Sequence, residues 1–166
     1  PSKLPKYRGP SPIEAAILNG DEQTAVSLMR LTAGMDEGPV YAQLAVRLDK
    51  SETRLSLSEK LAELGAQFLV DNLETILSKS LPPRPQNDSL ATYTKLLSKE
   101  DGITNWGEPA EVLERKTRAY RGYPKLRGEI SGHRVIINST RVASNETDGN
   151  LVIKCQPGWL EILELV

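Results

Sequence analysis

An aspartate framed by glycines is the first residue of this sequence whose setting could support chemistry. Asp36 lies in the run Gly34-Met35-Asp36-Glu37-Gly38. Glycine on either side lets the backbone turn sharply and hold the carboxylate at the end of a strand, and strand ends are where α/β sheets place their ligands. Taken alone, the same run is also typical of an aspartate in an ordinary tight turn, so its surroundings must decide between the two interpretations.

Few other side chains could act as a base, a nucleophile or a metal ligand. His133 is the only histidine, and its place beside the Ser131-Gly132 turn favours a surface position. Cys155 is the only cysteine, so the chain can form neither an internal disulfide nor a cysteine-based zinc site. We therefore expect no bound metal. The thiol should be a buried apolar side chain without a role in catalysis. The absence of possible disulfides favours a reducing compartment, either the cytoplasm or an organellar matrix.

Basic residues gather in one region of a chain whose net charge is only −1. Between positions 115 and 134 only Glu129 is acidic, whereas the basic residues are Arg115, Lys116, Arg118, Arg121, Lys125, Arg127 and Arg134. Such a cluster on a nearly neutral protein can mark a nucleic-acid contact. The alternative is a solvated helix face and hairpin, in which these cations pair with Glu111, Glu114 and Glu129.

The first half of the chain predicts α/β structure. Ser11, Pro12 and Glu14 have the pattern of a helix start with a capping box, and Asn19-Gly20 is a suitable end. Two strands are expected, at 24–31 and 40–48. A long helix should follow at 53–79, because its leucines recur at intervals of three and four and form one apolar face.

The second half predicts a connector, one helix and a β domain. Adjacent prolines and polar residues make 80–90 the clearest boundary. A helix is expected at 110–120. Four short alternating segments joined by turn residues then indicate a small antiparallel sheet or barrel, with strands at 125–130, 133–140, 151–155 and 159–166. No run approaches the roughly 20 apolar residues that a membrane-spanning helix needs.

The motifs in the first half resemble the second half of the catalytic domain of the folate-dependent formyltransferases. The matching elements keep the family's order, and they are Ser2-Lys3-Leu4-Pro5, Arg8-Gly9, Pro12-Ile13, Gly20-Asp21 with Thr24, and the Gly34–Gly38 loop. A further stretch, PQNDSLATYTKLLSKEDGITNW, followed by LERKTRAYRGYP, resembles the methionyl-tRNA formyltransferase family in particular. The resemblance spans nearly the whole chain and is weakest in the strands after residue 125.

Several positions depart from the family pattern. An asparagine and a histidine of that pattern would precede Pro1, and we therefore expect the isolated chain to be inactive. The loop reads Ser-Lys-Leu-Pro in place of Ser-Leu-Leu-Pro, and Glu37 stands where threonine is usual. The turn Arg121-Gly122-Tyr123 replaces the usual Asn-Pro-Trp.

The resemblance implies a role for each matching motif. Asp36 would be the catalytic aspartate that orients the histidine, and Ser2, Lys3, Leu4 and Pro5 would contact the co-substrate 10-formyltetrahydrofolate. The acceptor would be methionyl initiator tRNA, contacted by Lys6, Arg8, Arg115, Arg118, Arg121, Lys125 and Arg127. Lys6 and Arg8 could equally be solvated loop charges.

The expected fold class is α/β, the C-terminal part of a Rossmann-like domain, followed by a small all-β, OB-like barrel. The expected boundaries are 1–80 for the catalytic part, 81–105 for the linker and 106–166 for the β domain. Two alternatives stay open: a tRNA-binding module without chemistry, and part of a formyltransferase that acts on a sugar nucleotide. We expect a monomer that does not bind membranes.

Overall fold

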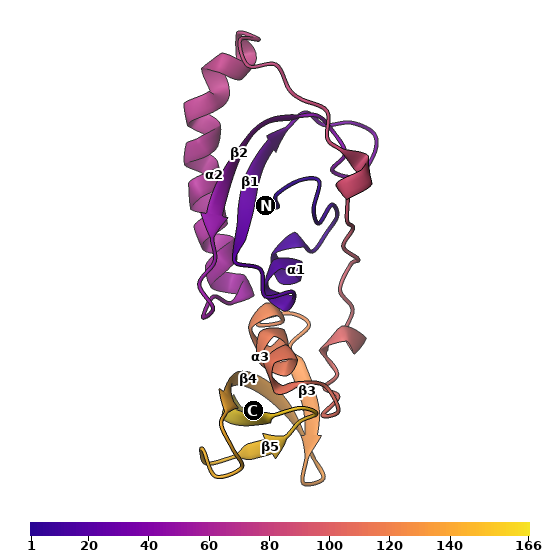
Figure 1. The fold of residues 1–166 in the computed structure, drawn as a ribbon, viewed down its shortest axis with the longest axis vertical. Coiled ribbons are helices and arrows are strands. Elements are labelled where there is room, and N and C mark those ends of the chain that lie inside the picture. The colour runs from indigo at the N-terminus through magenta and orange to yellow at the C-terminus, as the bar shows by residue number, and fades with distance from the viewer. The chain divides into compact units, whose positions relative to one another are not determined.

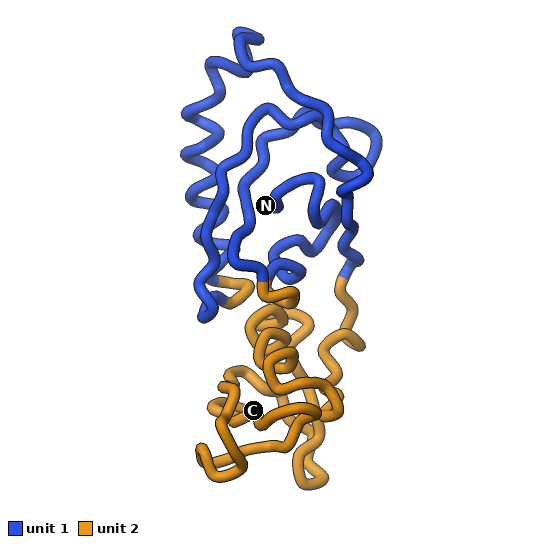
Figure 2. The backbone as a smooth tube through the Cα atoms, viewed as in Figure 1, with its two compact units in different colours: residues 1–16, 21–52, 56–96 blue, residues 17–20, 53–55, 97–166 orange.

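The computed structural model describes all residues from 1 to 166 and divides them into two compact units (Figure 2). Unit 1 comprises residues 1–16, 21–52 and 56–96, and unit 2 comprises residues 17–20, 53–55 and 97–166. Residues 81–96, which the sequence assigned to a linker, are grouped with unit 1. None of the helices has the length and apolar character needed to span a membrane.

Unit 1 is built on a two-stranded antiparallel sheet. Strand β1 (Gln23–Met29) pairs with β2 (Val40–Arg47), and Thr24 lies opposite Val46 in the register. Both strands lie where the sequence predicted them, within two residues at each end. The loop between them carries Asp36, so the hairpin itself presents the candidate catalytic residue at its end.

The predicted helices are confirmed as α1 (Pro12–Leu18) and α2 (Arg54–Leu77). Figure 1 shows α2 running alongside the two strands. The approach is close, because a β-carbon built on Gly65 would lie 3.4 Å from Val26 Cγ1. Leu57 and Leu61 are buried, whereas four apolar residues further along the helix are largely exposed, namely Leu69, Val70, Leu73 and Leu77.

The segment that follows α2 returns to the rest of unit 1 through backbone hydrogen bonds. Arg84 and Val40 exchange a pair of them, each 2.8 Å long. A short 3₁₀ turn at Asp88–Leu90 follows. Arg8 N–H then donates to the carbonyl of Thr92, and Thr94 N–H donates to the carbonyl of Arg8, both at 2.8 Å. We call residues 84–94 the strap, since they bind the hairpin at one end and the N-terminal loop at the other.

Unit 2 packs one helix on a four-stranded antiparallel sheet. A 3₁₀ turn (Glu100–Gly102) precedes α3 (Ala110–Ala119), and the sheet has the order β3-β4-β6-β5. Its strands are β3 (Leu126–Ile130), β4 (His133–Ala143), β5 (Val152–Lys154) and β6 (Trp159–Leu165). Its core includes the fully buried Leu113, Leu126, Ile137 and Leu160.

The sheet of unit 2 is open, since β3 and β5 lie at its two edges. The β domain predicted from the strand pattern is therefore present, as a sheet rather than a closed barrel. Cys155 is a free thiol and is buried, as expected for a small apolar residue. Burial raises the pKa of this thiol, which keeps it protonated and unreactive.

Candidate active site

The Asp36 loop is closed by the backbone on either side of it. Arg30 N–H donates to the carbonyl of Pro39 across the base of the loop, at 2.9 Å. A β-carbon on Gly38 would lie 1.8 Å from the carbonyl oxygen of Arg30, so only glycine allows this approach. Asp36 itself has φ +52, in the left-handed region that non-glycine residues occupy at a cost.

Two segments distant in the sequence hold Asp36 in place. The backbone N–H of Gly9 donates to the Asp36 carboxylate, with 2.8 Å from N to Oδ2. The Gln86 amide donates to the Asp36 backbone carbonyl and to that of Gly38, both at 2.7 Å. The carboxylate and the backbone of the same residue are thus fixed separately, and Asp36 is half-buried.

Residues 2–5 are held against the hairpin by their backbone. Ser27 Oγ donates to the Ser2 carbonyl at 2.6 Å, and the Gln43 amide donates to the Leu4 carbonyl at 2.9 Å. Ser2 and Leu4 are buried, Pro5 is half-buried and Lys3 is exposed. This arrangement fixes the path of the loop and leaves the Lys3 side chain accessible.

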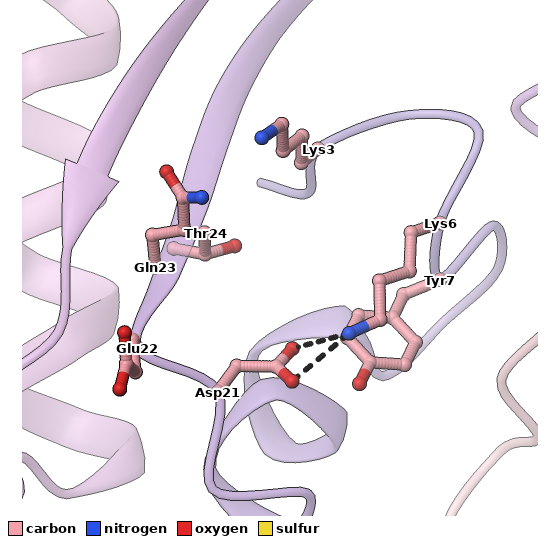
Figure 3. Close-up of a pocket in the computed structure, with 7 residues that line it drawn as sticks. All are labelled: Lys3, Lys6, Tyr7, Asp21, Glu22, Gln23 and Thr24. Carbon is pink, nitrogen blue, oxygen red and sulfur yellow. Dashed lines mark hydrogen bonds and ion pairs between the residues drawn. The ribbon is translucent and has the colours of Figure 1, made fainter.

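Two cavities flank this loop. The first, of about 300 Å³, is drawn in Figure 3 and is lined by Lys3, Lys6, Tyr7, Asp21, Glu22, Gln23 and Thr24. The second, of about 410 Å³, has Leu4 and Pro5 in its wall together with residues of β2 and of the strap. Hydrocarbon side chains at Leu4 and Pro5 suit a flat apolar group, whereas the first cavity is lined by charged and polar side chains.

Lys6 forms an ion pair in the first cavity. Its ammonium lies 2.8 and 2.9 Å from the two carboxylate oxygens of Asp21, as Figure 3 shows. Burial lowers the pKa of Lys6, but hydrogen bonds to Asp21 and Tyr7 outweigh that effect and leave the pKa above its ordinary value. The Lys6 side chain is exposed and can contact a phosphate. Its ion pair with Asp21 partly neutralises its charge and would weaken that contact.

Arg8, the other cation predicted to contact tRNA from this loop, points into the protein. It is 2% exposed. Its guanidinium donates to the Gln86 amide oxygen at 2.9 and 3.2 Å, to Asp88 Oδ1 at 2.7 Å and to the Tyr93 hydroxyl at 3.1 Å. These partners occupy the donors that a phosphate would need, so this geometry favours a structural role over the predicted contact.

Most cations of the predicted basic cluster also have partners within unit 2. Arg115 donates to the Leu18 carbonyl at 2.9 Å, and Arg127 donates to that of Lys99 at 2.8 Å. Arg118 pairs with Glu114 at 2.6 Å, and Lys116 pairs with Glu108. By contrast, Arg121 and Lys125 are exposed, and neither side chain has a hydrogen-bond or ion-pair partner.

The basic residues of unit 2 that were predicted to contact tRNA do not share one helix face. Helix α3 ends at Ala119, so Arg121 lies beyond it. The chain turns there, with positive φ at Gly122 and Lys125. Among the residues of unit 2 predicted to contact tRNA, only those of this turn keep their charge free for a partner.

Sequence reasoning missed Gln86 and Tyr93. Both lie in the strap, which was interpreted as a connector, and the family resemblance of this stretch gave neither of them a role. The parallel bridge between Arg8 and Tyr93 brings them to the N-terminal loop. No local pattern encodes such a contact, because its two sides lie 85 residues apart.

Two protein-family models match this chain. The family model "Formyl transferase" matches residues 1–73, and "Formyl transferase, C-terminal domain" matches residues 96–166. The chain belongs to the formyltransferase family. The resemblance inferred from the Ser2–Pro5 loop and the Gly34–Gly38 loop is thereby confirmed.

Individual formyltransferases give the same result. A methionyl-tRNA formyltransferase from Roseiflexus castenholzii is 44% identical over 145 residues, which cover 87% of this chain and 46% of that protein. One from Dictyoglomus turgidum is 39% identical over 179 residues, covering 99% of this chain and 57% of that protein. The chain thus spans about half the length of the curated relatives that it matches.

The fold of solved formyltransferases agrees with the one described above. The N-formyltransferase from Helicobacter canadensis, solved in complex with folinic acid and dTDP-3-aminofucose, matches with a TM-score of 0.80 at 19% identity. The match covers 99% of this chain and 64% of that protein. At this identity the likeness shows the formyltransferase fold and does not identify the acceptor.

Proposed function

We propose that this chain is the C-terminal part of a methionyl-tRNA formyltransferase, in which Asp36 is the catalytic aspartate. The complete enzyme transfers the formyl group of 10-formyltetrahydrofolate to the amine of methionyl initiator tRNA. The observation that carries the proposal is the position of Asp36. The Gly9 N–H binds its carboxylate, and the Gln86 amide binds its backbone carbonyl.

The chemistry needs a base and a site for developing negative charge. The amine loses a proton as it attacks the formyl carbon, and the carbonyl oxygen gains charge. In the family pattern, an asparagine and a histidine that would stand just ahead of Pro1 supply these groups. One carboxylate oxygen of Asp36 accepts from Gly9. The other can then accept from the histidine and orient it, as the aspartate of a catalytic triad does.

Folate and tRNA would meet different parts of the chain. We assign residues 2–5 to the folate side, because Leu4 and Pro5 line a cavity whose wall also contains Gln86, the residue that donates to the Asp36 carbonyl. We assign the phosphate contacts to Lys6 and to the turn with Arg121 and Lys125, since these cations are exposed. Arg115, Arg118 and Arg127 contribute less, because groups of the protein already occupy their donors.

A sugar nucleotide is the second candidate acceptor. The Helicobacter canadensis N-formyltransferase, solved with dTDP-3-aminofucose, has the same fold. The relatives at 39% and 44% identity favour tRNA at the level of sequence. We give the sequence relatives more weight, since one formyltransferase fold can serve unrelated acceptors.

Three finer expectations complete the proposal. The open sheet of unit 2 is the main part of an OB-like barrel, in which the Ile103 bridge to Arg127 extends the β3 edge. The complete enzyme is a monomer. It acts in the cytoplasm or an organellar matrix, where translation begins.

The proposal can be tested in a fusion protein. The segment of the Dictyoglomus turgidum relative that precedes its match would be joined to Pro1, which restores the missing half. We expect formyl transfer from 10-formyltetrahydrofolate to methionyl-tRNA, and none to dTDP-3-aminofucose. Asp36→Asn should keep folate binding, because the side chain retains its shape, and should lower kcat by about 10²–10⁴-fold.

Controls separate the possible outcomes of this test. The 166-residue chain alone should show no turnover, because it lacks the base. Preference for the sugar nucleotide would replace the proposed acceptor by the second candidate. Nearly normal turnover of Asp36→Asn would show that the catalytic carboxylate lies elsewhere.

A further inference from the structure

Gln86 uses every hydrogen-bonding position of its side chain, and all of its partners lie on or beside the Asp36 loop. The amide nitrogen donates to the carbonyls of Asp36 and Gly38, both at 2.7 Å. The amide oxygen accepts from Arg8 Nε at 3.2 Å and from Arg8 Nη2 at 2.9 Å. Gln86 lies among prolines after the long helix, near the start of the stretch that resembles the methionyl-tRNA formyltransferase family.

Arg8 fixes which way the Gln86 amide faces. A guanidinium can only donate, so the amide oxygen must be the atom that faces it. The amide nitrogen must then face the two carbonyls, which can only accept. Arg8 is in turn immobilised by burial, by Asp88 and by Tyr93. The orientation of Gln86 is therefore set before any substrate binds.

The network closes on the Asp36 carboxylate. Gly9 follows Arg8 in the chain and donates its N–H to Asp36 Oδ2. Arg8 thus acts on Asp36 by two routes, through Gln86 to its backbone and through Gly9 to its side chain. The left-handed φ of Asp36 needs such support, because a strained residue relaxes unless its surroundings over-determine it.

We propose that Gln86 is a positioning residue for formyl transfer, which holds the carbonyls of the Asp36 loop so that the carboxylate faces the histidine. This inference rests on the proposed function above. Gln86 also lines the cavity assigned to folate, but all of its donors and acceptors are already bonded within the protein, and the positioning role needs no contact with either substrate. Its two donors set the backbone of Asp36, and the backbone sets the direction of the side chain.

A purely structural role for Gln86 makes different predictions. If Gln86 only attached the strap to the N-terminal loop, its contact with Arg8 would be the one that mattered. Gln86→Glu separates the two roles, because the introduced carboxylate still accepts from Arg8 but cannot donate to Asp36 and Gly38. The matched control is Gln67→Glu, which removes an exposed amide donor to Asp71 on α2 in the same unit.

The first readout uses the 166-residue chain and needs no catalysis. Hydrogen exchange of the Gly9 amide reports its bond to the Asp36 carboxylate. We expect Gln86→Glu to speed this exchange at least about tenfold, since the loop opens locally, while Gln67→Glu leaves it unchanged. Circular dichroism would show that both variants keep their secondary structure. Unchanged Gly9 exchange in Gln86→Glu would overturn the proposal.

The second readout uses the fusion protein. We expect Gln86→Glu to lower kcat by about 10²-fold, as for other small misplacements of catalytic groups, with little change in the KM for folate. The loss should shrink as the pH falls, because a protonated carboxyl can donate to one of the two carbonyls. A merely structural role would give no such recovery.

The outcomes distinguish this inference from the proposed function. If Asp36→Asn is inactive and Gln86→Glu behaves like Gln67→Glu, the positioning role is wrong and the proposed function stands. If Asp36→Asn is active, the proposed function fails, and the Gly9 exchange alone decides whether Gln86 orders the loop. Gln86→Met, which removes the donors without adding charge, replaces Gln86→Glu if that variant does not fold, with the same expected direction.

Discussion

At the scale of single residues, burial decides what an arginine can do. Arg8 and Arg121 have the same side chain and were both expected to contact phosphate. Arg8 is buried among Gln86, Asp88 and Tyr93, whereas Arg121 is exposed and has no partner. A guanidinium already bonded within the protein must lose those bonds before it binds a phosphate, which weakens the contact.

This difference predicts how tRNA binding depends on salt. Arg121→Ala with Lys125→Ala removes two unpaired cations, whereas Arg115→Ala with Arg118→Ala removes two paired ones. The first pair should lower the slope of log affinity against log salt by roughly 0.7–0.9 for each phosphate that is no longer neutralised, and the second pair should change it far less. Titration of the chain with initiator tRNA at several salt concentrations measures both slopes. Equal slopes in the two variants would remove the special role of the turn.

At the scale of elements, the apolar face of α2 is regular in sequence but is buried along only part of its length. Its leucines recur at helical spacing from the first turn to the last, and the sequence therefore predicts a continuous packing face. The structure buries Leu57 and Leu61 but leaves Leu73 44% exposed. Periodicity identifies the helix and its apolar face, but it does not say how much of that face is covered.

Replacing a leucine of α2 by alanine should therefore lower the free energy of unfolding at a buried position and hardly change it at an exposed one. Leu61→Ala should lower the free energy of unfolding by about 2–5 kcal/mol, because it leaves a cavity. Leu73→Ala should change it by less than about 0.5 kcal/mol and should weaken the binding of an apolar dye such as ANS. Urea unfolding followed by circular dichroism, together with dye fluorescence, compares them. A similar loss of stability in both would mean that the whole face is packed.

At the scale of the whole chain, backbone hydrogen bonds locate the border between the two units. Tyr93 and Leu96 are similarly exposed, at 66% and 78%. The backbone on either side of Tyr93 is bonded to Arg8, through Thr92 and Thr94. Beyond Thr94 these bonds stop, and unit 1 ends at Leu96.

Chymotrypsin should detect this border. We expect the first cut after Leu96 rather than after Tyr93, because proteolysis requires local unfolding that the bonds to Arg8 oppose. The products would be residues 1–96 and 97–166, which mass spectrometry identifies. An initial cut after Tyr93 would show that the strap opens before the border does.

Local patterns in the sequence were enough to predict the helices, the strands and the family. Every α-helix and strand of the structure lies within a few residues of its predicted place, because capping residues, turn residues and apolar spacing act over short stretches of chain. The motifs around Leu4, Gly9 and Asp36 identified the family for the same reason, since each is a local run in a fixed order.

The side chains that surround Asp36 could not be predicted in this way, because the folded chain brings them together from distant segments. The tertiary structure placed Gln86 on the Asp36 carbonyl across 50 residues and on Arg8 across 78, turned Arg8 inward, and ended α3 before Arg121. The physical reason is that a buried hydrogen-bond network depends on how distant segments pack against one another. Residue spacing predicts whether a segment forms a helix or a strand. The hydrogen-bond partner of each buried donor and acceptor depends instead on which segments pack together in the folded chain.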